Sequence, residues 1–321
     1  MILVTGGTGF IGSHLLDRLS ASHIPARSLL RRKKTPRSLP LGIEPVFGDL
    51  VSGEGLEEAL RGATTVIHLA GVTKALRPAE YYAGNVQGTG VLLRALAGSS
   101  VRLVHVSSLA AAGPSPDGTP IDEDVPPHPL THYGKSKLEA ERLVRELCPQ
   151  AVVVRPPVVY GPRDTDVFAL LKSISQGVVI EIAGGDRWFS AIYVDDLVDG
   201  LLAAAESPKA AGRTYFLAHP KPLTWADLSL VAARIMSRRP RVVRVPMPVA
   251  HCTGFMAEMW SRLTRKPGIV SRDKILEAQC RWWTCDSRRA AAEIGFQAKT
   301  PLDAGLEVTL AWYKQAGWLK W

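Results

Sequence analysis

A chain of 321 residues is about twice the usual length of a single domain, and its 46% apolar, 21% charged and 7% aromatic residues are typical of globular proteins. This composition excludes a disordered chain, a collagen and a coiled coil. The four cysteines are too few for a disulfide scaffold and contain no C-x-x-C pair, and the histidines show no metal-ligand spacing, so no metal site is expected. No apolar run approaches the roughly 20 residues that cross a bilayer, and the first predicted strand begins at Ile2, which leaves no room for a signal peptide. We therefore expect a cytoplasmic protein.

The net charge of +9 is concentrated in residues 231–299, which hold 14 Lys and Arg against 5 Asp and Glu. An anionic substrate, an anionic membrane surface or plain solvation would each explain such a basic segment. The segment carries no known nucleic-acid-binding motif, so we expect no nucleic acid partner. We expect a small-molecule substrate, and peripheral membrane contact stays open.

Short apolar runs in the N-terminal half predict buried strands, because they do not alternate with polar residues. The runs are 2–5, 26–30, 43–47, 65–70, 101–107 and 151–155. Between them lie amphipathic helical patterns, such as Gly12, Leu15, Leu16 and Leu19. Strands that alternate with helices are typical of right-handed βαβ units, so the sequence predicts a doubly wound α/β fold with a parallel sheet.

The first strand leads directly into the glycine-rich turn TGGTGFIG of residues 5–12, which a helical pattern follows. Gly6 allows a tight turn, Gly9 lets the backbone approach a pyrophosphate, and Gly12 lets the helix pack close to the strand. The helix N-terminus would face the phosphates, so we predict a dinucleotide-binding domain of the Rossmann type. Its expected cofactor contacts in this turn are Gly6, Gly7, Thr8, Gly9, Phe10, Ile11 and Gly12.

The regular pattern ends after Gly161, where prolines become frequent, and seven of the eight tryptophans lie from Trp225 onward. We predict a Rossmann domain of residues 1–160 and 191–218, in which residues 214–218 return to the sheet as a strand. Residues 161–190 and 219–321 are predicted to form a smaller, mainly helical substrate lobe. This lobe is expected to close over the carboxyl edge of the sheet, where ligands bind in such folds.

The end of the second predicted strand selects the dinucleotide. No acidic residue lies between Asp17 and Glu44, where an NAD site places an acceptor for the ribose 2′-hydroxyl. The strand ends instead in Arg31 and Arg32, and a guanidinium suits a 2′-phosphate by its charge and its fork geometry. The sequence therefore favours NADP over NAD. The lysines and arginine that follow, Lys33, Lys34 and Arg37, are equally well explained as a solvated loop.

Tyr133 and Lys137 lie at the start of an amphipathic helical pattern, and their i, i+4 spacing places them on one face. An ammonium near the phenol is expected to lower the pKa of Tyr133, as a general base near neutrality requires. Ser107 and Ser108 end the fifth strand, where a hydroxyl can hydrogen-bond a substrate oxygen. These residues predict a Ser-Tyr-Lys proton relay beside a nicotinamide.

With these residues in place, the chain resembles the extended short-chain dehydrogenases/reductases of the epimerase/dehydratase branch. The resemblance runs through TGGTGFIG, GDL at 48–50, HLAG at 68–71, Asn85, SS at 107–108 with Gly113, YGKSK at 133–137 and RPPVVYGP at 155–162. It implies that Ser108, Tyr133 and Lys137 are catalytic, and that helices around 79–97 and 131–147 form a homodimer. The further cofactor contacts that it implies are Asp49, Leu50, Leu69, Ala70, Gly71, Asn85, Ser107, Tyr133, Lys137, Pro156 and Val158.

Departures from the pattern of the sugar-nucleotide members bear on the substrate. The arginine of their R-D-[FY]-x-[HY]-V-x-D segment, which binds a diphosphate, is replaced here by Phe189, and Arg187 is out of register by two. This difference favours members similar to 3β-hydroxysteroid dehydrogenases and dihydroflavonol reductases, which take bulky apolar alcohols and ketones. Phe189 and Ser108 are expected substrate contacts. Lys74 is either a further substrate contact or a solvated loop residue.

Three functions follow as hypotheses. The first is an NAD(P)-dependent oxidoreductase that acts on a secondary alcohol or ketone of a bulky, mainly apolar substrate. The second is a nucleotide-sugar epimerase or dehydratase whose cofactor is recycled within each turnover. The third is a non-enzymatic NAD(P)-sensing regulator, against which the complete set of Ser108, Tyr133 and Lys137 argues, because a sensor needs no proton relay.

Overall fold

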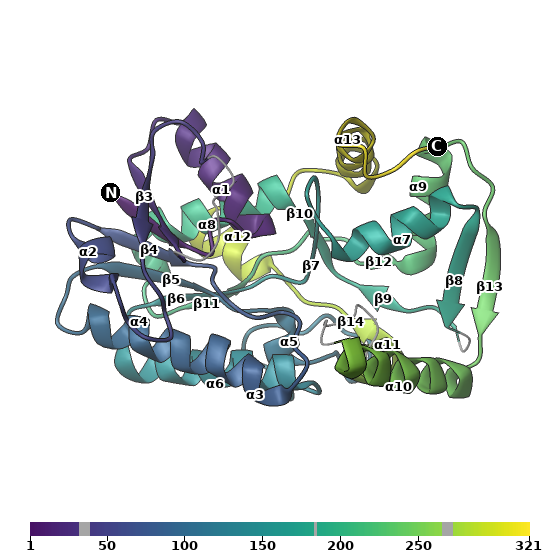
Figure 1. Cartoon of the computed structure of the whole chain (residues 1–321), viewed down its shortest axis with the longest axis horizontal. Helices are drawn as coiled ribbons and strands as arrows, with labels where there is room; N and C mark the ends of the chain where they lie inside the picture. Colours follow the sequence, from purple (N-terminus) through teal and green to yellow (C-terminus); the bar gives the residue numbers. More distant parts are fainter. Residues whose placement is uncertain (32–38, 183–184, 265–271) are drawn as a thin grey trace.

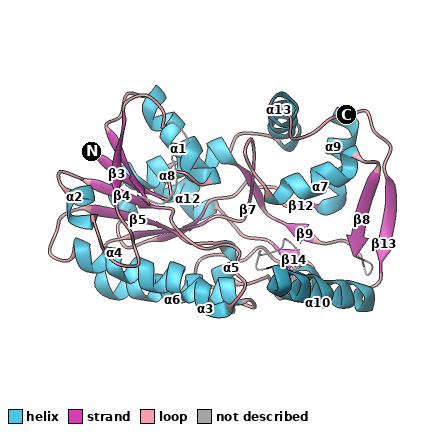
Figure 2. Cartoon of the chain, viewed as in Figure 1, coloured by secondary structure: helices cyan, strands magenta, loops and turns pink. Residues whose placement is uncertain are grey.

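The centre of the molecule is a seven-stranded parallel sheet with the strand order β11-β6-β5-β4-β1-β2-β3 (Figures 1 and 2). The computed structural model describes residues 1–31, 39–182, 185–264 and 272–321. The strands are β1 (Ile2–Thr5), β2 (Ala26–Leu30), β3 (Ile43–Phe47), β4 (Thr65–His68), β5 (Arg102–Val106), β6 (Val152–Arg155) and β11 (Thr214–Phe216). The order reverses between β1 and β4, which is the topology of a Rossmann-type α/β fold. The predicted fold class is confirmed.

The strands formed where the apolar runs predicted them. The bounds of β1, β2 and β3 are those predicted, and the other four strands begin or end within two residues of the predicted bounds. The differences lie mainly at the carboxyl ends, where residues such as Leu69 and Ser107 fall just outside the strands. These residues belong to the loops that border the candidate site.

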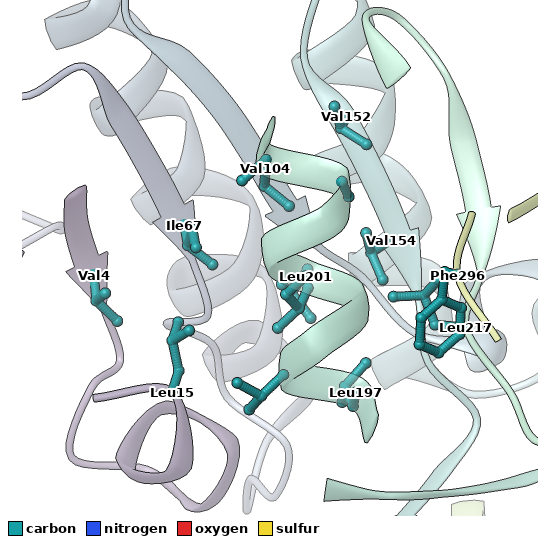
Figure 3. Close-up of a cluster of buried hydrophobic side chains, with 14 of the residues drawn as sticks. Val4, Leu15, Ile67, Val104, Val152, Val154, Leu197, Leu201, Leu217 and Phe296 are labelled. Atoms are coloured by element: carbon teal, nitrogen blue, oxygen red, sulfur yellow. The ribbon is translucent and has the colours of Figure 1, made fainter. Parts of the chain in front are cut away.

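Both faces of the sheet are buried, which is why its strands show no alternation. Leu3 and Val4 are both fully buried, and they point to opposite faces because they are consecutive in a strand. Val4 belongs to one buried core with Leu15, Leu197 and other side chains of α1 and α8 (Figure 3). Leu3 belongs to the core on the other face, together with Leu92 and residues of α2 and α6.

Helices cover both faces of the sheet (Figure 1). On the face of Val4 lie α1 (Phe10–Ala21), α8 (Val194–Glu206) and α12 (Arg288–Ile294). On the face of Leu3 lie α2 (Leu56–Leu60), α4 (Gly88–Leu96) and α6 (His132–Leu147). Short elements complete this half: α3 (Pro78–Tyr81), the π-helix Tyr82–Gln87, α5 (Leu109–Ala112) and a 3₁₀ turn, Pro208–Ala210.

The predicted substrate lobe contains helices and three small sheets. Its helices are α7 (Asp166–Ser175), α9 (Trp225–Ile235), α10 (Met247–Thr264), α11 (Arg272–Gln279) and α13 (Leu302–Gln315). The sheets pair β7 (Val158–Tyr160) with β10 (Ala191–Tyr193), β8 (Val178–Ile182) with β13 (Arg241–Val245), and β9 (Trp188–Phe189) with β12 (Leu223–Thr224) and β14 (Trp282–Trp283). These strands were not predicted individually, since runs of two or three residues leave no periodic signal.

Residues 288–298, which the sequence assigned to the lobe, pack on the large sheet. Ala290, Phe296 and Ala298 belong to the same buried core as Val4 and Leu217. Phe296 lies beside Leu217 in Figure 3. Among the described helices, none is long and apolar enough to cross a membrane.

Candidate active site

The glycine-rich turn connects β1 to α1 at the carboxyl edge of the sheet. Gly6 has a φ of +74°, and a Cβ there would lie 2.6 Å from the backbone nitrogen of Ala70, so only glycine fits. A Cβ on Gly12 would lie 2.2 Å from the carbonyl oxygen of Gly6. Gly9 caps α1 without a side-chain acceptor, so the first N–H groups of the helix have no capping partner in the turn. Such a helix N-terminus suits a phosphate, so the turn fits the pyrophosphate of a dinucleotide.

The other predicted contacts of the turn lie around this point. Thr8 and Gly9 are exposed, and Phe10 and Ile11 are half-buried at the start of α1. Gly7 is buried over β2, where its position would bring a Cβ within 2.4 Å of Ser28 Oγ. The exposed part of the turn is therefore the part that faces away from the sheet.

The adenosine end of the predicted cofactor site lies beside β2 and β3. Arg31 directly follows β2 and is exposed. Arg32, the second predicted phosphate contact, lies outside the described residues. Asp49 Oδ1 accepts hydrogen bonds from the backbone N–H groups of Val51 (2.7 Å) and Ser52 (3.1 Å), which fixes the loop after β3. Leu50 packs partly buried against the core on the α4 side.

Asn85 holds the loop that follows β4. Its Oδ1 accepts a hydrogen bond from the N–H of Val72 (2.7 Å), and its Nδ2 donates to the carbonyl of Val72 (3.0 Å) and to Ser136 Oγ (2.9 Å). Asn85 lies in the π-helix, a form of helix that often occurs at functional sites. The bonds fix Gly71 and Val72 against α6. Earlier in the loop, the N–H of Leu69 donates a hydrogen bond to the carbonyl of Thr5 (3.1 Å), which extends the hydrogen bonding between β1 and β4 by one residue.

The N-terminal turn of α6 carries the two residues that the sequence paired. Thr131 caps the helix by accepting a hydrogen bond from the N–H of Gly134 (3.1 Å). Lys137 lies one turn after Tyr133, and its Nζ donates to the carbonyl of Val106 at the end of β5 (2.7 Å). Burial lowers the pKa of Lys137 to about 8. The ammonium is therefore held at the carboxyl edge of the sheet, next to Gly71.

The hydroxyl of Ser108 lies near enough to the phenol of Tyr133 to act on its pKa. Burial raises the pKa of Tyr133 above 10, and the hydroxyl of Ser108 opposes that rise. The i, i+4 spacing predicted that Lys137 would lower the pKa of Tyr133. Lys137 is instead directed at the carbonyl of Val106, and the charges that act on Tyr133 come from Lys274, Glu277 and Asp166.

Ser107, Pro156 and Val158 border the site from neighbouring strands. The N–H of Ser107 donates a hydrogen bond to the carbonyl of Val154 in β6 (2.7 Å). The N–H of Leu109 donates one to the carbonyl of Pro156 (2.9 Å). Val158 begins β7, one residue after the second proline of the RPP segment. The ends of β5 and β6 are thus fixed to each other where Ser108 begins α5.

A buried ion pair under the site was not predicted. Arg155 donates to Glu141 through Nε (2.9 Å) and Nη2 (2.7 Å), and Ser107 Oγ donates to the same carboxylate (2.5 Å). Arg155 is 2% exposed and Glu141 1%. The signal in the sequence was an acidic residue, Glu141, on the apolar face of α6 beside Ala140 and Val144. The pair ties α6 to β6 and so fixes Tyr133 relative to Ser108.

The predicted lobe closes over Tyr133 through α11 and α7. Asp273 of α11 accepts a hydrogen bond from the N–H of His132, the residue before Tyr133 (3.2 Å). Lys74 forms an ion pair with Asp166 at the start of α7. Lys74 was predicted as either a substrate contact or a solvated residue, and in this structure it joins the loop after β4 to the lobe. No pattern in the sequence indicates Asp273 or Lys274, which lie more than a hundred residues from Tyr133.

Phe189 is buried, with an exposed fraction of 2%, and stacks on Trp225 with 4.1 Å between ring centroids. Trp282 packs near Gly118, where a Cβ would lie 3.1 Å from its ring. The position of the diphosphate-binding arginine is thus occupied by an aromatic stack. Within the described part of the chain, no group of three His, Cys, Asp or Glu side chains could hold a metal ion.

The chain is similar in sequence to known proteins. The profile of the NAD dependent epimerase/dehydratase family matches residues 2–218. The chain is 31% identical over 320 residues to the ceramide reductase of Caulobacter vibrioides (strain NA1000 / CB15N), covering 99% of this chain and 96% of that protein. It is 29% identical over 330 residues to a 4-hydroxy-2-methyl-3-oxo-4-farnesyl-3,4-dihydroquinoline-1-oxide ketoreductase of Stigmatella aurantiaca, covering 98% and 96%.

Solved structures are similar in fold over nearly the whole chain. The crystal structure of gox2253 has a TM-score of 0.83 and 26% identity, covering 100% of this chain and 99% of that one. MoeE5 in complex with UDP-glucuronic acid and NAD has a TM-score of 0.78 and 26% identity, covering 98% and 99%.

The sheet order and the glycine turn define a nucleotide-binding α/β enzyme of the Rossmann type. The chain belongs to the NAD dependent epimerase/dehydratase family, within the extended short-chain dehydrogenases/reductases. The relatives are named as reductases, dehydrogenases and epimerases, which agrees with an enzyme rather than a sensor.

Proposed function

We propose that this enzyme is an NAD(P)-dependent oxidoreductase that transfers hydride at a secondary alcohol or ketone of a bulky, mainly apolar substrate. The observation that carries the proposal is the convergence of Ser108, Tyr133 and Lys137 at the carboxyl edge of the sheet. The apolar substrate is supported by the Phe189–Trp225 stack, which stands where sugar-nucleotide members carry their arginine. Ceramide and a farnesyl-bearing quinoline oxide, which the relatives' names specify, both carry long hydrocarbon chains.

In this proposal each of the three residues has one role. Ser108 positions the substrate oxygen by a hydrogen bond, and Tyr133 exchanges a proton with that oxygen. When a ketone is reduced, the phenol of Tyr133 donates its proton to the ketone oxygen, and the rise of its pKa by burial favours the protonated form that this needs. Lys137 holds a positive charge beside the ribose side of the site. Bound NAD(P) would supply or accept the hydride.

The cofactor contacts follow from the same geometry. The exposed turn around Gly9 and the N-terminus of α1 would bind the pyrophosphate, and Asp49 and Leu50 would border the adenine. Asn85 would keep Gly71 open to the ribose. The exposed guanidinium of Arg31 supports NADP over NAD.

We also propose a homodimer formed through the helices of residues 79–97 and 131–147, which light scattering would test.

Nucleotide-sugar epimerisation or dehydration is the second candidate, and the similarity to the MoeE5 complex favours it. A panel of long-chain ketones and UDP-sugars distinguishes the two. We expect stoichiometric oxidation of NADPH with the ketones and no interconversion of the sugars. Interconversion of a UDP-sugar with no net consumption of NADPH would establish the second candidate instead.

A further inference from the structure

Helix α10 presents an apolar stripe to solvent. Met256 and Met259 follow Val249 by seven and ten residues, so the three side chains share one face of the helix. Their exposed fractions are 49%, 68% and 52%, and the neighbouring Phe255 is 47% exposed. Ala250, by contrast, is buried on the opposite face, where the helix packs against the protein. Val249, Met256 and Met259 therefore keep about half or more of their surface exposed.

Exposed apolar side chains also occur in β13, which precedes α10 and is joined to it through Pro246. Val243 of β13 is the register partner of Ile180 in β8, so the two side chains lie on the same face of this two-stranded sheet. Both are about half exposed or more. Several exposed apolar side chains in two consecutive elements favour an interaction site over scattered surface residues.

Exposed arginines lie in β13 and just before it. Arg238, Arg239, Arg241 and Arg244 lie in the segment that leads into α10, and all four are exposed. Arg244 has an acidic neighbour, Glu181, at 3.6 Å. The stretch that contains them, residues 231–299, carries the net charge of +9 of the whole chain. Exposed apolar side chains flanked by arginine are the features of a helix that lies in the interface of an anionic membrane.

The position of α10 relative to the candidate active site gives this surface a use. α10 packs on α11, where His251 contacts Gln279 (Figure 1). α11 in turn contacts the start of α6 through Asp273 and His132, next to Tyr133. One helix thus separates the apolar stripe from the candidate reacting residues.

We propose that α10 and β13 bind the surface of an anionic phospholipid membrane, with the apolar stripe in the boundary between headgroups and acyl chains. The proposal rests on the proposed function, because a bulky apolar substrate would reside in that layer. Docking through α10 brings the α11 side of the active site to the membrane, so that substrate is taken from the lipid. The bound surface is recognised by its acyl chains together with its negative charge.

The test is co-sedimentation with vesicles. Wild-type protein should bind vesicles of phosphatidylcholine and phosphatidylglycerol at low salt, bind pure phosphatidylcholine weakly, and lose affinity as salt rises. The double variant M256E/M259E removes two apolar contacts, each of which contributes about tenfold to the affinity for vesicles. Its affinity for the mixed vesicles should therefore fall by about a hundredfold. Val308→Glu on α13 is the matched control, because Val308 is equally exposed on another helix and should leave binding unchanged.

Activity separates this inference from the proposed function. M256E/M259E should keep wild-type turnover on a water-soluble ketone, which also shows that it folds, and lose turnover on a ketone embedded in vesicles. Equal vesicle binding by the variant and the wild type would overturn the membrane surface, even if ketones are reduced. A difference in oligomeric mass between the lipid-free variant and the lipid-free wild type would also overturn the membrane surface, since the stripe would then join copies of the chain. Vesicle binding without reduction of any ketone would instead refute the proposed function alone.

Discussion

At the scale of single residues, the phenol of Tyr133 is the group on which the proposed chemistry depends. Tyr133→Phe removes the exchangeable proton and keeps the ring, so turnover should fall roughly 10²-fold or more. Binding of NADPH, followed by fluorescence, should stay close to wild type. Tyr81→Phe is the matched control, because its ring lies 6.1 Å from that of Tyr133 and has no part in the relay. Near wild-type turnover of Tyr133→Phe would show that another group exchanges the proton.

Arg31 carries the proposed preference for NADP. Arg31→Asp replaces a phosphate partner by an acceptor for a ribose hydroxyl, so NADP affinity should fall about tenfold to a hundredfold, the equivalent of about 1.5–3 kcal/mol, while NAD affinity is kept or improved. Titration calorimetry with both dinucleotides measures this. Lys209→Asp makes the same change of charge in the turn before β11, at the amino edge of the sheet, and should alter neither affinity. Equal wild-type affinities for NAD and NADP would refute the preference.

Much of the site could be predicted because its residues lie in local patterns. The glycine turn and the Tyr133–Lys137 spacing are each contained within one or two helical turns of sequence. The direction of Lys137 could not be predicted, because it depends on the carbonyl of Val106, which a different strand supplies. The same holds for Asp273, which reaches the start of α6 from a distant helix.

At the scale of elements, the pair of Arg155 and Glu141 joins α6 to β6. Glu141→Leu leaves a buried guanidinium without its partner, so we expect a loss of about 3–5 kcal/mol in the free energy of unfolding. The double variant Glu141→Leu/Arg155→Met should recover most of that loss, because neither charge remains buried. Urea denaturation measures all three proteins. Glu58→Leu, which removes the exposed pair with Arg61, should cost less than about 1 kcal/mol. A double variant no more stable than the single one would contradict this account.

The elements of the large sheet could be predicted and those of the lobe could not, for one physical reason. A strand buried on both faces needs an uninterrupted apolar run, and that run is visible in the sequence. β9, β12 and β14 have two residues each, and their pairing depends on tertiary contacts alone. Trp188 and Phe189 therefore had no pattern from which a strand could be inferred.

At the scale of the whole molecule, two buried histidines connect stability to pH. Burial lowers the pKa of His68 from 6.5 to about 3 and that of His105 well below 6.5. The unfolded chain takes up these protons below about pH 6.5 and the folded chain does not, so stability should fall as pH drops from 6.5 toward 3. Neither ring nitrogen of His105 has a hydrogen-bond partner among the described residues.

His105→Leu isolates this contribution. The variant should be at least as stable as wild type at pH 7.5, because it removes an unpaired polar group from the core. Between pH 6.5 and 5, its free energy of unfolding should fall less steeply than that of the wild type. Well below pH 6.5, the two slopes should differ by about 1.4 kcal/mol per pH unit. Urea denaturation at several pH values gives both results. The control is His251→Gln, an exposed histidine, whose slope should match wild type. Parallel curves for His105→Leu and wild type would exclude His105 as a source of the acid sensitivity.

Phe296 and Val4 belong to one buried core, which has a consequence for synthesis of the chain. The first strand leaves the ribosome long before the residues that complete its hydrophobic surroundings, so the nascent sheet must keep apolar surface exposed for nearly the whole of translation. Strand β11 joins only after residue 214, and the segment of Phe296 later still. A chain that stopped at the end of the family match, residue 218, would contain every strand of the large sheet and still lack part of its core. Expression of this enzyme should therefore depend on chaperones that hold the unfinished N-terminal part, and shortened chains should aggregate rather than yield an independent nucleotide-binding unit.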